Sequence, residues 1–195
     1  MAVANALPAN FAAPDWSSIS RFAELHPKEL MAMREPGTFH IVDKLQQFGT
    51  DIEHAQLRYH RKRVLVSKQF TFDAAHHLHC YEGKCKNLHG HTYIVVFGIS
   101  GIPGETGLTL DFGDIKTIWK ERIEPYLDHR YLNETLPPMN TTAENMVVWI
   151  FEQMESALTS EAYRSRVEGG RTEFVRLFET PTSYAEFRRE WMLDE

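Results

Sequence analysis

Histidines and cysteines are concentrated in one short stretch of the sequence. Five of the ten histidines and both cysteines lie between residues 70 and 97. Residues 70–76 alternate in the manner of a strand, which places His76 at the strand's end on its phenylalanine-bearing face. His89 and His91 are two residues apart on the next expected strand, so their side chains point the same way, and Gly90 leaves room for close approach. The two strand ends are therefore expected to bring His76, His89 and His91 together.

Three neutral imidazoles form a set that suits zinc, which binds histidine nitrogens at about 2.0–2.1 Å. Three protein ligands leave the fourth tetrahedral position open, as in catalytic zinc sites. Cys85 lies four residues before His89 in a short loop, and the flanking Lys84 and Lys86 favour its thiolate form. The sequence therefore predicts a zinc site with Cys85 as a base or nucleophile beside it. The alternative is a structural zinc-binding module, not an enzyme, in which Cys85 is the fourth ligand.

Length and composition favour a folded globular protein with one main domain. The chain has 195 residues, 43% of them hydrophobic and 25% charged, which are ordinary values. The formal net charge of −6 argues against nucleic acid as the main partner. No apolar run approaches the roughly 20 residues that span a bilayer, and the first residues do not resemble a secretory signal. Two closely spaced cysteines make a poor disulfide framework, so we expect a cytoplasmic protein and no membrane partner.

The chain divides into two parts by its apolar content. Residues 1–66 contain few strongly apolar positions and are predicted to be a partly helical N-terminal extension without an assigned role, with helices over residues 15–26 and 51–59. The basic segment at residues 58–63 is expected to be either solvated surface or an attractor for an anionic substrate. Residues 67–195 are predicted to be the main domain.

Two helices are expected after the histidine-bearing strands. Apolar residues at helical spacing predict a helix over residues 114–126, which Pro125 ends. Thr141 as N-cap and Glu144 form a capping box that opens a second helix to about Leu158. Between these helices, Asp128 and His129 are adjacent in an expected loop, where they are either ordinary surface residues or a proton relay.

Two strands are expected near the C-terminus, after a turn at residues 169–170. Alternation predicts strands over residues 172–180 and 184–191. Glu179 falls on the apolar face of the first, and since a buried carboxylate is costly without donors, it is expected to bind a ligand or the donors of a partner. The order strand, strand, helix, helix, strand, strand indicates an α+β fold with antiparallel pairs.

Five motifs in this order resemble 6-pyruvoyltetrahydropterin synthase and its relatives over about residues 67–191. They are FDAAH at 72–76, the cysteine and His-Gly-His pattern at 85–91, Asp-His at 128–129, TTAEN at 141–145 and Glu-Thr at 179–180. The resemblance implies a tunnelling fold (T-fold, ββααββ), which is a four-stranded antiparallel sheet with two helices on one face. It also implies that subunits assemble into an oligomeric β-barrel, a trimer or hexamer, with active sites between subunits.

The three-residue spacing between Cys85 and the His-Gly-His motif resembles 6-carboxytetrahydropterin synthase of the queuosine pathway. The implied reaction converts 7,8-dihydroneopterin triphosphate to 6-carboxy-5,6,7,8-tetrahydropterin, acetaldehyde and triphosphate; the alternative is 6-pyruvoyltetrahydropterin synthase, whose cysteine spacing is usually longer. By position, the resemblance assigns Zn²⁺ binding to His76, His89 and His91, proton transfer to Cys85, Asp128 and His129, and pterin binding to Glu179, Thr141 and Thr142. Lys84 and Lys86 are either triphosphate contacts or solvated loop residues.

Overall fold

The computed structural model describes residues 60–193. The helices predicted over residues 15–26 and 51–59 lie outside the described residues, as does most of the predicted N-terminal extension. The first described strand, β1 (Val64–His76), begins slightly before the predicted start of the main domain at residue 67. None of the helices in the described part of the chain is both long and apolar enough to cross a membrane.

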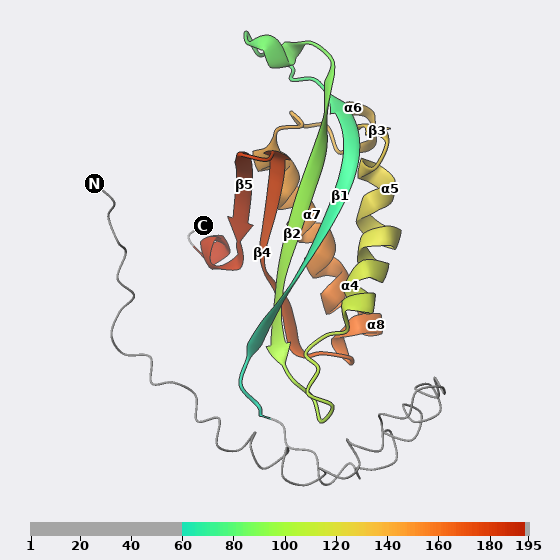
Figure 1. The fold of residues 1–195 in the computed structure, drawn as a ribbon, viewed down its shortest axis with the longest axis vertical. Helices are drawn as coiled ribbons and strands as arrows, with labels where there is room; N and C mark the ends of the chain where they lie inside the picture. The colour runs from blue at the N-terminus through green and yellow to red at the C-terminus, as the bar shows by residue number, and fades with distance from the viewer. Residues whose placement is uncertain (1–59, 194–195) are drawn as a thin grey trace, which may run out of the picture. The chain divides into compact units, whose positions relative to one another are not determined.

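The sheet has five strands in the order β3-β1-β2-β4-β5 (Figure 1). Four of them pair antiparallel, namely β1, β2 (His89–Ile102), β4 (Glu168–Thr180) and β5 (Ser183–Arg188). The α+β class and these antiparallel pairs agree with the prediction.

The prediction of a four-stranded, wholly antiparallel sheet is wrong, because β3 (Arg130–Tyr131) adds a fifth strand parallel to β1. This strand has only two residues, too few to show an alternating pattern in sequence. It forms because tertiary packing brings the loop against β1, where the His129 amide donates a hydrogen bond to the Asp73 carbonyl at 2.6 Å.

The first predicted helix is a continuous run of three segments, α4 (Phe112–Ile118), the π-helix η4 (Trp119–Ile123) and α5 (Glu124–Leu127). The expectation that Pro125 ends the helix is wrong, because Pro125 lies in the first turn of α5 and the helix continues beyond it. A proline lacks an N–H donor, and the first turn of a helix does not need one. The π-helix η4 ends directly before it, where the Glu124 amide donates to the Trp119 carbonyl, so Pro125 begins a new α-helical turn.

The second predicted helix is α7 (Ala143–Thr159), and its N-cap is one residue later than expected. Thr142, not Thr141, is the cap, and its hydroxyl accepts a hydrogen bond from the Asn145 amide at 3.3 Å. The predicted capping box is therefore wrong, since the residue at its third position is Asn145 and not Glu144. Two short helices were not expected: α6 (Leu132–Thr135) and α8 (Glu161–Arg164).

The last two strands also differ in length from the prediction. Residues 169–170, expected as a turn, lie inside β4, because β2 continues far enough to pair with Glu168. Gly169 adopts a φ of 61°, which a glycine tolerates without strain. At the other end, β5 stops at Arg188 and is followed by the 3-10 helix η5 (Arg189–Leu193), not by further strand.

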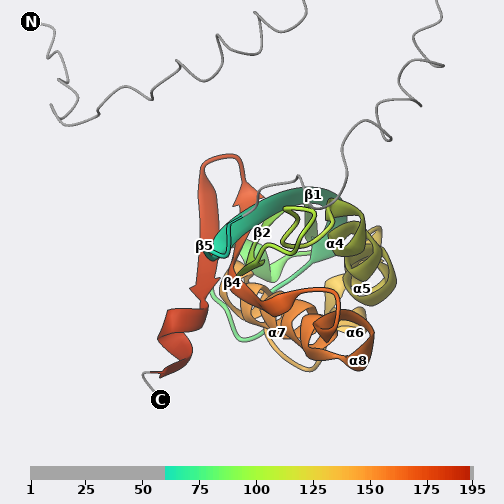
Figure 2. The same cartoon turned by 90° about the horizontal axis from the view of Figure 1, so that it is seen from below.

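The main helices cover one face of the sheet, and the hydrophobic core lies between these helices and the sheet (Figure 2). Its fully buried side chains come from the sheet and from both helical segments: Tyr93, Val95, Phe97, Ile99, Val175, Leu177, Ile115, Ile118, Trp119, Met146, Ile150 and Met154. The opposite face carries apolar side chains that are only partly buried, among them Ile94, Val96, Phe174 and Phe178. Among the described residues, no helix covers that face.

Candidate active site

The three predicted ligand histidines meet at one end of the sheet. His76 ends β1 and pairs directly with His89 at the start of β2, with His91 two residues further on. One ring nitrogen from each of the three lies within 4.8 Å of the others. A Cβ atom at Gly90 would be only 3.1 Å from the Ala74 carbonyl oxygen, so the glycine permits the close strand approach that brings the rings together.

Hydrogen bonds from the chain fix the orientation of two of these rings. The Nδ1 atom of His76 lies 2.8 Å from the Thr141 carbonyl oxygen and 3.2 Å from the Thr141 hydroxyl. The Nδ1 atom of His89 lies 2.8 Å from the Asn87 carbonyl oxygen. A carbonyl can only accept, so in each ring Nδ1 carries the proton and Nε2 is the unprotonated nitrogen. Histidine ligands of metals are commonly oriented in this way.

The environment of His91 and the protonation state of His76 also suit a metal. The Nε2 atom of His91 is buried and has no hydrogen-bond partner, which is costly unless a ligand binds it. Burial lowers the pKa of His76, and nearby His89 and His91 lower it further, although the Thr141 carbonyl and Glu179 act in the opposite direction. A neutral imidazole is the form that binds a cation. The donor set therefore fits a divalent metal such as zinc.

Glu179, from the end of β4, lies against the same cluster. Its Oε1 atom is 3.7 Å from His76 Nε2 and 3.8 Å from His91 Nε2, and its side chain is 32% exposed. It lines a cavity of about 250 Å³ together with His76, Cys85, Thr142 and Tyr184. This cavity is large enough for part of a small organic ligand beside His76.

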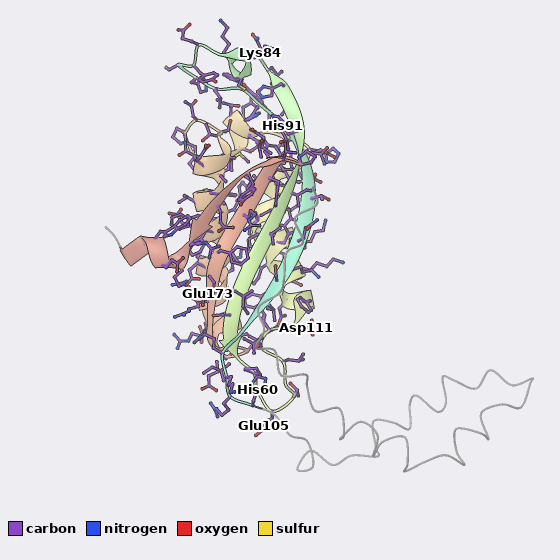
Figure 3. The ribbon with its side chains drawn as sticks, turned by 60° about the vertical axis from the view of Figure 1, so that its left-hand side comes forward. His60, Lys84, His91, Glu105, Asp111 and Glu173 are labelled. Atoms are coloured by element: carbon purple, nitrogen blue, oxygen red, sulfur yellow. The ribbon has the colours of Figure 1, made fainter. Side chains whose placement is uncertain are left out.

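Cys85 is half-exposed in this cavity, within the 3-10 turn η3 (Lys84–Lys86) of the long β1–β2 connection. A hydrogen bond from the Leu78 amide to the Cys85 carbonyl, 2.8 Å long, holds this turn against the strand end. In the described chain, the group of converging donor atoms contains the three histidines and not Cys85. Figure 3 shows His91 near the end of the sheet from which the loop carrying Lys84 extends.

Asp128 and His129 form a pair, and His129 lines a different cavity from Cys85. His129 adopts a φ of 55°, which turns its ring back so that Nδ1 lies 3.0 Å from Asp128 Oδ1. Burial alone would raise the pKa of Asp128, but hydrogen bonds from the Asp73 amide and His129, with the charges of His129 and Lys120, lower it overall. The His129 side chain is 78% exposed and lines a cavity of about 550 Å³ with Asp73 and Arg130.

Thr141 and Thr142 have different environments. Thr141 is fully buried behind His76, which it orients. Thr142 lines the cavity that contains Cys85 and Glu179. Within one chain, therefore, Cys85, Thr142 and Glu179 line one cavity and His129 lines another. Of the three ligand histidines, His76 lines the first cavity and His91 the second.

Over residues 65–190 the sequence matches the family described as 6-pyruvoyl tetrahydropterin synthase. The chain belongs to this family. It is 37% identical over 98 residues to the 6-carboxy-5,6,7,8-tetrahydropterin synthase of Synechocystis sp., covering 48% of this chain and 76% of that protein. It is 32% identical over 141 residues to the enzyme of the same name from Haemophilus influenzae, covering 63% of this chain and 97% of that protein.

Solved structures support the fold assignment of this synthase-family chain. The Caenorhabditis elegans 6-pyruvoyl tetrahydropterin synthase matches with a TM-score of 0.56 and 24% identity, covering 66% of this chain and 98% of that one. At that identity the likeness concerns the fold. The relatives thus carry the names of both reactions considered from the sequence.

Sequence reasoning missed two features of the candidate site. Tyr93 is fully buried, and its hydroxyl lies 3.3 Å from His76 Nε2. Burial raises the pKa of Tyr93, as do the charges of Glu179 and Cys85, so the hydroxyl stays protonated. Its position two residues after His91 on the same strand face was a usable signal. Asn87 was missed as well, and no sequence pattern indicated that its carbonyl orients His89.

Proposed function

We propose that the protein is a zinc-dependent 6-carboxy-5,6,7,8-tetrahydropterin synthase. It would convert 7,8-dihydroneopterin triphosphate to 6-carboxytetrahydropterin, acetaldehyde and triphosphate, as in queuosine biosynthesis. The observation that carries the proposal is the cluster of three converging histidines, one of which, His76, lines a cavity together with Cys85 and Glu179. A site permanently closed by four protein ligands would have no position for a substrate.

Each group around the cavity has a role that its position supports. Zinc held by His76, His89 and His91 would supply Lewis-acid activation of the substrate's side-chain oxygens, which acidifies the neighbouring C–H. Cys85, half-exposed in the cavity, would take or return that proton as thiolate. Glu179 would accept two N–H hydrogen bonds from the guanidine-like edge of the pterin. Thr142, at the cavity wall, would contact the pterin ring.

Thr141 is proposed as a positioning residue. Its carbonyl and hydroxyl both contact Nδ1 of His76, so they hold the ring with Nε2 toward the centre. As predicted from the resemblance, Thr141 would lie near the pterin, but its own contacts support an action through His76.

We further propose that Asp128 and His129 contribute to the active site of a neighbouring subunit. Three observations support this: His129 lines a different cavity from Cys85, the His129 ring is largely exposed, and the uncovered sheet face carries apolar side chains suited to burial in an oligomer. Asp128 would keep His129 oriented and stabilise its charged form while it serves as the complementary acid or base.

Mixed oligomers test this shared site. Cys85→Ala and His129→Ala variants, each expected to be inactive, would be unfolded together and refolded as a mixture. If neighbours share sites, about one quarter of the sites in a random equal mixture contain both intact groups, and activity returns to that level. If each chain supplies its own complete site, no activity returns.

The choice between the two family reactions rests on the three-residue spacing after Cys85 and on the two relatives named for the carboxy reaction. Mass spectrometry of the products from dihydroneopterin triphosphate tests it. Carboxytetrahydropterin with acetaldehyde is the expected result, and pyruvoyltetrahydropterin would favour the alternative.

The remaining alternative is a structural zinc-binding module with Cys85 as the fourth ligand. In the proposed enzyme, Cys85→Ala keeps its zinc and loses turnover by at least about 100-fold. In a structural site, the same substitution would reduce zinc retention and thermal stability together. Metal content measured beside activity in that one variant separates the two.

A further inference from the structure

The position of Glu179 suggests a second role for its carboxylate. The Oε1 atom lies 3.7 Å and 3.8 Å from two histidine Nε2 atoms, which is too long for a hydrogen bond to either. Two donors bound to one tetrahedral zinc at about 2.0–2.1 Å lie roughly 3.3–3.4 Å apart, so the observed spacing exceeds that of shared ligands by only a few tenths of an ångström. The carboxylate oxygen therefore lies close to two of the three ligand nitrogens, just outside the described group of three histidines whose donor atoms all lie within 4.8 Å of one another.

The chemistry of the centre favours a carboxylate beside these nitrogens. The three histidines bind as neutral rings and leave the full charge of a divalent cation uncompensated. Among the described residues, Glu179 is the acidic side chain that lies against these nitrogens. No hydrogen bond to its carboxylate is found within the described part of the chain, so this half-buried anion is not committed to another partner.

We propose that Glu179 is a displaceable fourth ligand of the metal. In the substrate-free enzyme the carboxylate would close the coordination shell, and on binding the pterin it would turn to the N–H edge of the ring and free that position. This inference rests on the proposed pterin-binding role of Glu179. Its consequence is that the metal becomes available to the substrate's side chain only when a pterin ring is in place.

Binding of azide to the cobalt-substituted protein tests this without turnover. Cobalt(II) reports a new ligand through its visible absorption, and azide is a small ligand for an open position. Glu179→Gln removes the charge and most of the ligand strength, whereas Glu179→Asp keeps the charge but is one methylene shorter and cannot reach the metal. The aspartate variant therefore separates ligation from simple repulsion of azide.

We expect both variants to bind azide at least about tenfold more tightly than the unsubstituted protein does, since losing a ligand opens the shell. Pterin without a side chain, added to the unsubstituted protein, should raise its azide affinity toward that of the variants. Equal azide affinity in all three proteins would overturn ligation by Glu179. A Glu179→Asp variant that resembles the unsubstituted protein would also overturn it, because charge alone would then explain the effect.

Failure of this inference and failure of the proposed function are distinguishable. If the pterin leaves azide binding unchanged while catalytic products are still formed, then displacement is wrong and the enzyme assignment stands. If azide binding behaves as expected but no pterin product forms from dihydroneopterin triphosphate, then the ligand role stands and the proposed reaction is wrong. Circular dichroism of each variant shows that the fold is retained.

Discussion

Thr141 and Thr142 are neighbours with the same side chain, and the structure predicts different consequences for their loss. Thr141 has no exposed surface, and its hydroxyl lies 3.2 Å from His76 Nδ1, beside the main acceptor at 2.8 Å. Thr142 caps α7 through the Asn145 amide. We therefore expect Thr141→Val to weaken metal binding and Thr142→Ala to weaken the helix.

The magnitudes follow from the contacts that each substitution removes. Valine has nearly the volume of threonine, so Thr141→Val removes one of two hydrogen-bond contacts to the ring, worth about 0.5–1.5 kcal/mol. If all of this free energy is lost from zinc binding, the dissociation constant for zinc rises about 2- to 12-fold. Loss of the Thr142 cap costs about 1 kcal/mol of folding stability, or a decrease in Tm of about 2–4 °C for a chain of this length.

Two measurements on each variant test this. Zinc affinity is measured by competition with a chromophoric chelator, and Tm is measured on metal-free protein so that metal binding does not contribute. The expected pattern is weaker zinc binding in Thr141→Val only and, for Thr142→Ala, a lower Tm at unchanged zinc affinity. The opposite pattern, with Thr142→Ala releasing zinc and Thr141→Val leaving it bound, would refute the assignment of His76 orientation to Thr141.

Three further predictions concern pH and metal. The pKa of Asp128 is lower in the folded state than in the unfolded chain, so its carboxylate stabilises the fold above the unfolded-state pKa and loses this effect as pH falls. In thermal melts, the Tm difference between the unsubstituted protein and Asp128→Asn should therefore shrink below about pH 4. The pKa of Tyr93 is higher in the folded state than in the unfolded chain, so its contribution to stability is fully present at neutral pH and is lost as pH rises past about 10. Above that pH the unsubstituted protein should lose stability relative to Tyr93→Phe, and an equal change of Tm with pH in the two proteins would contradict this. Removing the metal with a chelator should lower stability by about 2.7 kcal/mol relative to protein with zinc at 100 times its dissociation constant, and added zinc should restore it in a denaturant titration.

Much of the site could be predicted from the sequence because its residues are close along the chain. His76 ends one strand, and His89 and His91 begin the strand that pairs with it, so alternation and one connecting loop were enough to bring the rings together. The antiparallel pairs and the second helix followed from hydrophobic periodicity, since burial of one face imposes a period of 2 on strands and 3.6 on helices. The family motifs were also local features of the sequence.

Contacts between distant segments decided the features that could not be predicted from the sequence. The cap of α7 falls at Thr142 because the preceding Thr141 is held against His76, which is far away in the sequence. The short strand β3 and the extension of β4 exist because a neighbouring strand offers free backbone groups, and no side-chain pattern of their own records this.

The sequence by itself determined the ligand histidines, the alternation of the main strands and the membership of Glu179 in the apolar face of β4. Only the tertiary structure decided that Glu179 lies against two of those histidines and that His129 lines a different cavity from Cys85. The physical reason is that periodicity reports which face a residue occupies, whereas the packing of separate strands and loops sets the distance between residues on those faces.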